Sequence, residues 1–329
     1  MKVLSLFDGM SCARIALDRA AIPVTSYKAS ELDKYAIKVS HANYPDIEQL
    51  GDVCDVKAKD VGKIDLLIGG SPCQGFSFAG KQLNFDDPRS KLFFEFVRLK
   101  DELNPKAFIL ENVRMKQESQ DIISKYLGVE PVRFNSSLVS AQNRQRLFWT
   151  NIDFDLPDDK GIILADILED GITDRGKSHC LDANYFKGGN LKSYFEKHRR
   201  QLVFSPNGMC HVGDADLNGN QSIKRVYAAE GKAPTLTTMG GGHREPKVIT
   251  SPIRDKSKTV RSGGRGSYDR HEWDSVDKLH WRKLTPLECE RLQTVPDNYT
   301  NHVSNTQRYK MLGNGFTVDV VAHILKGLH

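Results

Sequence analysis

The sequence lacks the marks of several large classes of protein. It has no run of about 18 apolar residues, the length that a membrane-spanning helix needs. The apolar core of the first seven residues is too short for a signal peptide, and no cleavage site follows it. We therefore expect a cytoplasmic protein with no membrane partner.

Cysteine is scarce and scattered. The six cysteines show no C-x-x-C spacing, which argues against a zinc ribbon and against a disulfide framework. The chain also offers no tight cluster of His, Cys and Asp side chains that could hold a metal ion. We expect free thiols and no metal site.

The net charge of the chain is small, but the basic and acidic residues are unevenly distributed along it. The 329 residues carry a net charge of +5, with 39% hydrophobic and 27% charged residues, as in an ordinary globular protein. Residues 171–285 hold 21 Lys or Arg against 12 Asp or Glu, so the rest of the chain is acidic. A basic segment on an acidic body favours a polyanion partner, most often nucleic acid, although a merely solvated face remains an alternative.

The N-terminus predicts a nucleotide-binding unit. An apolar strand over residues 3–7 leads through Gly9 into a helical pattern over 13–20, which is the start of a doubly wound sheet. Glu31 follows a second strand roughly 20 residues later, where a ribose-binding carboxylate belongs. Asp52 follows a third strand and could accept from an exocyclic adenine amine. Both acids could instead cap helices, and one glycine alone could be a tight turn.

A cysteine stands in the loop after the next strand. The apolar run over residues 64–68 ends in a glycine-rich loop that carries Cys73. Pro72 fixes the backbone before the thiol and Gly75 frees it afterwards, which suits a nucleophile that a substrate must approach closely. A small buried cysteine at a strand end is the alternative.

Two further groups are expected near this thiol. An amphipathic helix over 90–103 and a strand over 106–110 precede Glu111, and the ends of neighbouring parallel strands share one edge of a sheet. Arg144 and Arg146 occupy alternate positions of an extended segment, so both could grip one phosphate or base carbonyl. Each of the three could equally be an ordinary solvated charge.

The strand-helix rhythm fades after residue 161. Glycine-rich loops with basic residues follow, the densest over 233–244, which could enter a DNA groove. A helix over 282–293 begins with a capping box at Thr285 and Glu288, and an apolar helix closes the chain. We expect one domain from 1–160 and 305–329, and a second from 161–304 that includes the 282–293 helix.

Eight motifs follow one another over nearly the whole chain. They are Phe7-Asp8-Gly9, Glu31, Asp52, Pro72-Cys73-Gln74, Glu111-Asn112-Val113, Gln142-x-Arg144-x-Arg146, Arg282-Lys283-Leu284-Thr285-x-x-Glu288, and Gly313-Asn314-Gly315 with Val318. In this order they resemble the motifs of the DNA (cytosine-5)-methyltransferase family of bacterial or phage type. Ser11 departs from the family's Phe-x-Gly-x-Gly, in which the second glycine stands at that position.

The resemblance implies an α/β fold, the class I S-adenosylmethionine-dependent methyltransferase fold, which is a Rossmann-like mixed sheet with helices on both faces. A smaller, irregular target-recognition domain would accompany it. The cofactor would be S-adenosyl-L-methionine, leaving S-adenosyl-L-homocysteine as product. Its expected contacts are Phe7, Gly9, Ser11, Cys12, Glu31, Asp52, Val53, Pro72, Asn314 and Val318.

The resemblance also implies catalytic roles. Cys73 would add to C6 of a cytosine flipped from duplex DNA, and Glu111 would hold a proton at N3 and bond the exocyclic amine. Arg144 would contact the cytosine carbonyl, with Arg146 and Gln142 supporting the site. Expected DNA contacts are Gln74, Gly75, Ser77, Asn112, Thr235, Leu236, Thr237, Arg244 and Arg282.

Three other functions compete with this interpretation. An RNA cytosine-5 methyltransferase of the same fold would use the same cysteine, and a non-catalytic DNA-binding relative would keep the fold alone. A nicotinamide oxidoreductase explains the first strand-helix unit and none of the later motifs. We expect a monomer or weak dimer acting on double-stranded DNA, with a cognate restriction endonuclease as a further partner.

Overall fold

The computed structural model describes residues 1–71, 91–188, 191–204, 211–214, 225–228, 247–249 and 281–328. The chain divides into two compact units. The first, which we call the sheet unit, comprises Met1–Ile167, Gly176–Gly188 and Thr285–His329, and the second unit comprises Leu168–Arg175 and Gly189–Leu284.

The boundary between the units differs from the expected one. The sequence predicted that 161–304 would form the second domain, yet residues 161–167, 176–188 and 285–304 belong to the sheet unit. The expected capping box is confirmed, because the Thr285 side chain accepts from the Glu288 N–H and the Glu288 carboxylate accepts from the Thr285 N–H. It opens helix α8 (Pro286–Leu292) inside the sheet unit.

A buried ion pair explains why α8 stays with the sheet unit. Glu290 of α8 is fully buried and lies 3.0 Å from the guanidinium of Arg308, on helix α9 (Asn305–Asn314). Thr300 donates to the same carboxylate through its backbone N–H at 2.8 Å. A buried charge that lost such partners would be strongly destabilising, so the pair binds α8 to α9. Such a contact between residues far apart in the chain leaves no local signal in sequence.

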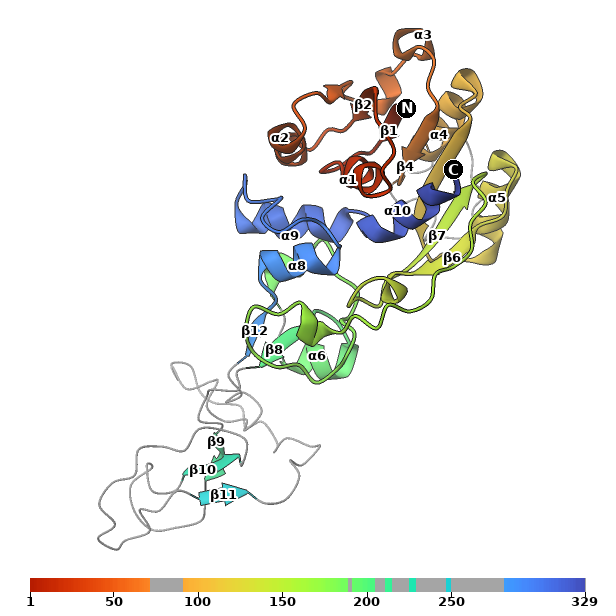
Figure 1. Ribbon diagram of the computed structural model, residues 1–329. Helices are drawn as coiled ribbons and strands as arrows, with labels where there is room; N and C mark the ends of the chain where they lie inside the picture. Colours follow the sequence, from red (N-terminus) through yellow and green to blue (C-terminus); the bar gives the residue numbers. More distant parts are fainter. Residues whose placement is uncertain are drawn as a thin grey trace, which may run out of the picture. The chain divides into compact units, whose positions relative to one another are not determined.

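One seven-stranded mixed sheet organises the sheet unit (Figure 1). The strand order is β3-β2-β1-β4-β5-β7-β6. Strand β1 pairs in parallel with β2 on one side and with β4 on the other, and the parallel pairing continues to β3 and to β5. Strand β7 runs antiparallel to β5 and β6. The strands are β1 (Lys2–Leu6), β2 (Ser26–Ser30), β3 (Glu48–Gln49), β4 (Leu66–Gly69), β5 (Ala107–Val113), β6 (Val132–Asn135) and β7 (Gln145–Thr150).

The doubly wound fold predicted from the sequence is confirmed by this order and by the helices between the strands. The remaining helices of the sheet unit are α1 (Cys12–Arg19), α2 (Lys34–Asn43), α3 (Ala58–Val61), α4 (Lys91–Leu103), α5 (Gln117–Leu127) and α10 (Val318–Leu325), with short 3₁₀ turns that include η1 (Val53–Asp55) and η5 (Tyr185–Lys187). Among the residues described, no helix is both long and apolar enough to span a bilayer.

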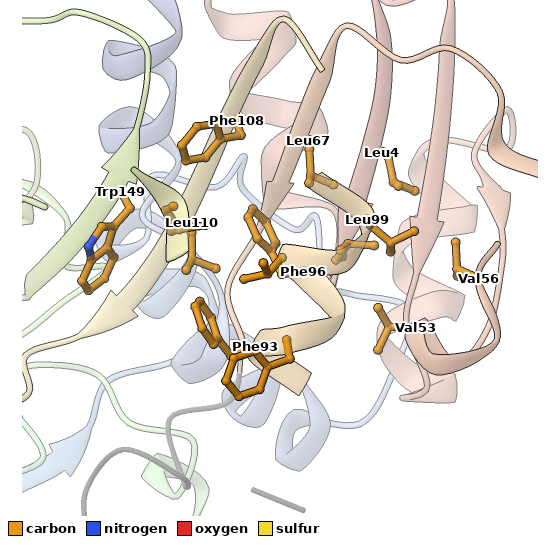
Figure 2. Close-up of a cluster of buried hydrophobic side chains, with 14 of the residues drawn as sticks. Leu4, Val53, Val56, Leu67, Phe93, Phe96, Leu99, Phe108, Leu110 and Trp149 are labelled. Atoms are coloured by element: carbon orange, nitrogen blue, oxygen red, sulfur yellow. The ribbon is translucent and has the colours of Figure 1, made fainter. Parts of the chain in front are cut away.

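The core lies between the sheet and α4, as Figure 2 shows. Phe93, Phe96 and Leu99 recur at helical spacing and are all within 1% of full burial. They pack in one cluster with Leu4 of β1 and Trp149 of β7, so α4 joins strands from both halves of the sheet. Helix α1 packs against α10 instead (Figure 1), so the C-terminal helix returns to the first strand-helix unit as expected.

The second unit is described only in part. Strand β12 (Trp281–Lys283) pairs antiparallel with β8 (Leu202–Phe204), and Leu202 packs with Tyr194 of helix α6 (Leu191–Lys197). A second small sheet comprises β9 (His211–Asp214), β10 (Arg225–Ala228) and β11 (Lys247–Ile249).

Candidate active site

A cavity of about 510 Å³ opens at the carboxyl ends of the parallel strands in the sheet unit, a volume typical of small-molecule sites. Most of the expected site residues that the structure describes lie in its wall. The expected residues that line it are Phe7, Gly9, Cys12, Glu31, Asp52, Val53, Glu111, Asn112, Arg144, Arg146 and Asn314.

The other expected residues fall into two groups. Ser11, Gln142 and Val318 are buried in the sheet unit and do not line the cavity, and Arg282 belongs to the second unit. Outside the described residues lie Pro72, Cys73, Gln74, Gly75, Ser77, Thr235, Leu236, Thr237 and Arg244.

The loop after β1 and the end of β2 form one side of the cavity. The backbone N–H of Gly9 donates to Oε2 of Glu31 at 2.7 Å, so the carboxylate ties the two strand ends together. Its Oε1 accepts from the N–H groups of Leu32 and Asp33, both at 2.8 Å. A carboxylate has about four lone-pair positions, and the described part of the chain occupies three of those on Glu31.

Asp52 fills the capping role and also lines the cavity, where its expected contact with adenine stays a prediction. It is the N-cap of η1, where Oδ1 accepts from the Cys54 N–H at 3.0 Å, and it also lines the cavity. Val53 beside it is buried and supplies apolar wall. The corner therefore presents an acceptor next to an apolar surface, as an adenine ring requires.

Cys12 also lines the cavity, but its thiol is inert. Burial raises the pKa of Cys12 to about 12, because a thiolate would lose its water, and the nearby Asp8 carboxylate adds to this effect. The group stays a neutral thiol at neutral pH, and a thiol is a poor nucleophile. Cys12 therefore lines the cavity and does not act as a nucleophile.

Opposite this side lies an ion pair between two neighbouring strands. Nε of Arg146 on β7 lies 2.9 Å from Oε1 of Glu111 on β5, and each side chain is about one-seventh exposed. Strand β5 runs three residues beyond the expected end, because residues 111–113 pair with β7. The register places Val113 opposite Arg146, so the arginine reaches back along the strand to Glu111.

The end of β4 comes close to this pair. A Cβ built on Gly70 would lie 3.2 Å from Oε2 of Glu111 and 2.9 Å from the ring of Phe316. Only a glycine permits that approach without displacing its neighbours. Glu111 thus faces the chain three residues before Cys73, which supports the expected meeting of the two groups.

The matches to known proteins agree with this arrangement. A family model described as C-5 cytosine-specific DNA methylase matches residues 1–329. The chain belongs to this family. Its activity is methylation of cytosine at C5 in DNA.

Curated relatives of this methylase are bacterial and phage proteins. The orphan methyltransferase M.SPBetaI of Bacillus phage SPbeta is 28% identical over 100% of this chain and 97% of its own length. The type II methyltransferase M1.ScrFI of Lactococcus lactis subsp. cremoris is 31% identical over 97% of this chain and 76% of its own. The type II methyltransferase M.HhaI of Haemophilus parahaemolyticus is 26% identical over 98% and 93%.

Solved structures share the fold. The Entamoeba histolytica methyltransferase EhMeth has a TM-score of 0.65 at 15% identity and covers 100% of this chain and 97% of its own. A putative DNA modification methyltransferase encoded within an E. coli prophage has a TM-score of 0.54 at 22% identity, covering 100% and 98%. These likenesses, with the strand order, confirm the class I methyltransferase fold.

The two arginines of the methylase do different things, which the sequence interpretation missed. Arg144 is buried, and its Nη2 donates to the carbonyls of Gly313 and Gly315 at 3.2 and 3.1 Å. Its Nη1 donates to the carbonyl of Leu181 at 2.9 Å. These contacts argue against the expectation that both guanidinium groups grip one ligand, because the terminal nitrogens of Arg144 already bind the protein's own backbone.

Gln142 and Asn112 also hold backbone in place. Gln142 is fully buried, where its Oε1 accepts from the Leu181 N–H at 2.8 Å. Asn112 donates through Nδ2 to the carbonyl of Ser71 at 3.3 Å, immediately before Pro72. Both side chains fix loops around the cavity, and only Asn112 reaches its wall.

Two expected residues have other contacts. Val318 begins α10 and is fully buried, and its N–H donates to the Gln293 carbonyl at 3.0 Å. In the second unit, Arg282 donates through Nε to the Asp170 carboxylate at 2.9 Å. A DNA contact by Arg282 stays a prediction.

Sequence reasoning missed part of the wall. Phe316 lines the cavity beside Gly70, and its position directly after Gly313-Asn314-Gly315 is the signal that could have found it. Lys310 of α9 pairs with Asp33, the N-cap of α2, at 2.8 Å, and both residues line the cavity. Their pairing joins elements far apart in sequence, so no local pattern predicts it.

Proposed function

We propose that this methylase transfers a methyl group from S-adenosylmethionine to C5 of a cytosine flipped out of double-stranded DNA. The observation that carries the proposal is the single cavity that has acceptors for an adenosyl group on one side and the Glu111–Arg146 pair on the other. A site for two reactants needs both sides within one cavity.

The residues present fit the cofactor. A Cβ built on Gly9 meets no atom within 4 Å, so the backbone borders open space along the loop after β1. Glu31 would accept a hydrogen bond from a ribose hydroxyl at its remaining lone-pair position, and Asp52 would accept from the adenine amine. S-adenosylmethionine would supply the methyl group that the activated cytosine takes up.

The cytosine would bind between Glu111 and Arg146. Glu111 would hold a proton at N3 and accept from the exocyclic amine, which draws charge from the ring as the thiolate adds. The contacts favour Arg146 over Arg144 for the cytosine carbonyl. Arg146 pairs with Glu111 and donates to the carbonyl of the neighbouring Gln145, whereas the buried Arg144 binds carbonyls of two distant segments. Arg144 would then act as a positioning residue.

Cys73 would supply the nucleophile. Its thiolate would add to C6, so that C5 becomes nucleophilic. After methyl transfer, loss of the C5 proton and elimination of the thiolate would restore the aromatic ring. Because C6 is covered in a stacked duplex, the base must leave the helix first.

Partners and location complete the proposal. The enzyme would act as a monomer or weak dimer in the cytoplasm of a bacterium. Relatives named type II methyltransferases support a cognate restriction endonuclease, whereas phage relatives named orphan methyltransferases support action alone. The second unit would read the target sequence.

Methyl transfer from labelled S-adenosylmethionine to matched DNA and RNA duplexes tests the proposal. We expect label in cytosine of DNA with the native chain, and none with Cys73→Ala, whose DNA binding should persist. Label confined to RNA would support the RNA alternative and overturn the DNA substrate. Undiminished methylation by Cys73→Ala would overturn the covalent route.

A further inference from the structure

A buried hydrogen-bond network lies beneath the loop that follows β1. Ser11, at the N-cap of α1, has φ 64° and ψ 40°, which is the left-handed region that side chains with a Cβ rarely adopt. The family pattern that this chain resembles has glycine at that position. A serine here carries a conformational strain that a glycine does not.

The Ser11 side chain does not cap its helix. It donates to the Asp8 carboxylate and lies 2.6 Å from the hydroxyl of Ser40 on α2. The residue is fully buried, so no water competes for these bonds. Two partners on different elements therefore fix the hydroxyl, and with it the backbone of Ser11.

Asp8 is the centre of the network. It is 5% exposed and accepts from the hydroxyl of Tyr27 on β2 at 2.7 Å. The backbone N–H of Asp8 donates to the Ser30 carbonyl at 3.2 Å, and the backbone N–H of Ser11 donates to the Asp8 carbonyl at 3.1 Å. Asp8 also lines the cavity, so these bonds hold the loop at the cavity wall itself.

Burial raises the pKa of Asp8 to about 6, the largest cause being loss of hydration, while hydrogen bonds from Ser11 and Tyr27 lower it. At pH 7.5 the group is an anion that accepts from both hydroxyls. The bonds to a charged acceptor are stronger than bonds between neutral groups.

We propose that Asp8, with Tyr27 and Ser40, holds Ser11 in the left-handed conformation and thereby positions the loop for the cofactor. The network does for this chain what a second glycine does in the family pattern. Gly9 lies between Asp8 and Ser11 and donates to Glu31, so a shift of the loop would also move the ribose-binding carboxylate. This inference rests on the proposed use of S-adenosylmethionine.

The test separates positioning from a merely structural role by two substitutions at one residue. Ser11→Ala keeps the Cβ but loses the network, whereas Ser11→Gly loses both the strain and the network. We expect Ser11→Ala to raise the Kd for S-adenosylmethionine about tenfold and Ser11→Gly to stay within about threefold of the native value. Ser119→Ala, a buried serine on α5, is the matched control.

The measurement is titration calorimetry with S-adenosylmethionine, with the melting temperature as a check that each variant folds and with the affinity for DNA, which should not change. Native affinity in Ser11→Ala would overturn the inference, and so would equal losses in Ser11→Ala and Ser11→Gly. If Ser11→Ala does not fold, Tyr27→Phe replaces it, with an expected rise in Kd of about threefold. No rise in Tyr27→Phe would then overturn the inference.

The native chain separates this inference from the proposed function. A native chain without affinity for S-adenosylmethionine would contradict the proposed function itself. Native binding with unchanged binding by the variants would contradict the network alone.

Discussion

The two sides of the cavity are built in different ways. On the proposed cofactor side, Glu31 accepts hydrogen bonds from the backbone of its own loop and of the loop after β1, and Asp52 accepts from the turn that it caps. On the substrate side, Glu111 and Arg146 come from two strands and satisfy each other. The first side is set by local turns, whereas the second depends on an antiparallel register. Each side can therefore be damaged without the other.

The largest expected effect comes from the substrate side. Glu111→Gln removes the proton holder and the charge that orients Arg146, so kcat should fall about a thousandfold while the Kd for S-adenosylmethionine is unchanged. Single-turnover methylation and calorimetry on one preparation measure both values. The control is Glu118→Gln, an exposed glutamate on α5. A matching loss of cofactor affinity would show that the two sides are not independent.

The loop after β1 should make the stability of the chain depend on pH. Burial raises the pKa of Asp8 from 3.8 to about 6, so between these values the folded chain holds a proton that the unfolded chain has released. Its contribution to stability is therefore full at low pH and is lost as pH rises through 6. The loss is about 3 kcal/mol over the whole window and about 1.4 kcal/mol between pH 5 and 7.5.

Asp8→Asn isolates this contribution. The free energy of unfolding in urea, native minus variant, should fall by about 1.4 kcal/mol from pH 5 to 7.5. A difference that stays constant with pH would mean that Asp8 titrates as it does in water.

Substitution of Arg144 and of Arg146 should have different effects on stability and on rate. Arg144→Lys should lower the free energy of unfolding by about 2 kcal/mol, since a lysine cannot serve the carbonyls of Leu181, Gly313 and Gly315 together. Arg146→Lys should leave stability nearly unchanged and lower kcat instead. Chemical denaturation and methylation rates of the two variants compare them directly. Equal effects on stability would refute the division of roles.

The smallest effect is expected at Asp52. Asp52→Asn keeps an oxygen for the Cys54 N–H but weakens the acceptor for adenine, so the Kd for S-adenosylmethionine should rise about tenfold with kcat at saturation unchanged. Asp55→Asn, an exposed neighbour in η1, serves as control. A change in kcat without a change in Kd would contradict a role for Asp52 in binding the cofactor.

The sequence predicted the local features well. The strands over 3–7 and 64–68, the helix over 90–103 and the capping box at Thr285 are present because each depends on patterns within one segment. The parallel order of β4 and β5 then brings Gly70 and Glu111 to one edge, as expected.

Features that depend on distant contacts were not predictable in this way. Alternation would place Arg144 and Arg146 on one face, but β7 begins at Gln145, so Arg144 lies before the strand and turns into the protein. The unit boundary was misplaced for a similar reason, because the Glu290–Arg308 pair that binds α8 to α9 leaves no pattern in either segment.

The central claim is that Cys73 acts on a cytosine held beside Glu111 and Arg146. Duplex DNA with 5-fluorocytosine at the target tests it, because the fluorine at C5 cannot leave as a proton does and elimination of the thiolate is blocked. With S-adenosylmethionine present, mass spectrometry of digested protein should find the peptide with Cys73 joined to a methylated fluorocytosine nucleotide. Absence of an adduct, or an adduct on Cys12 or Cys180, would contradict the account.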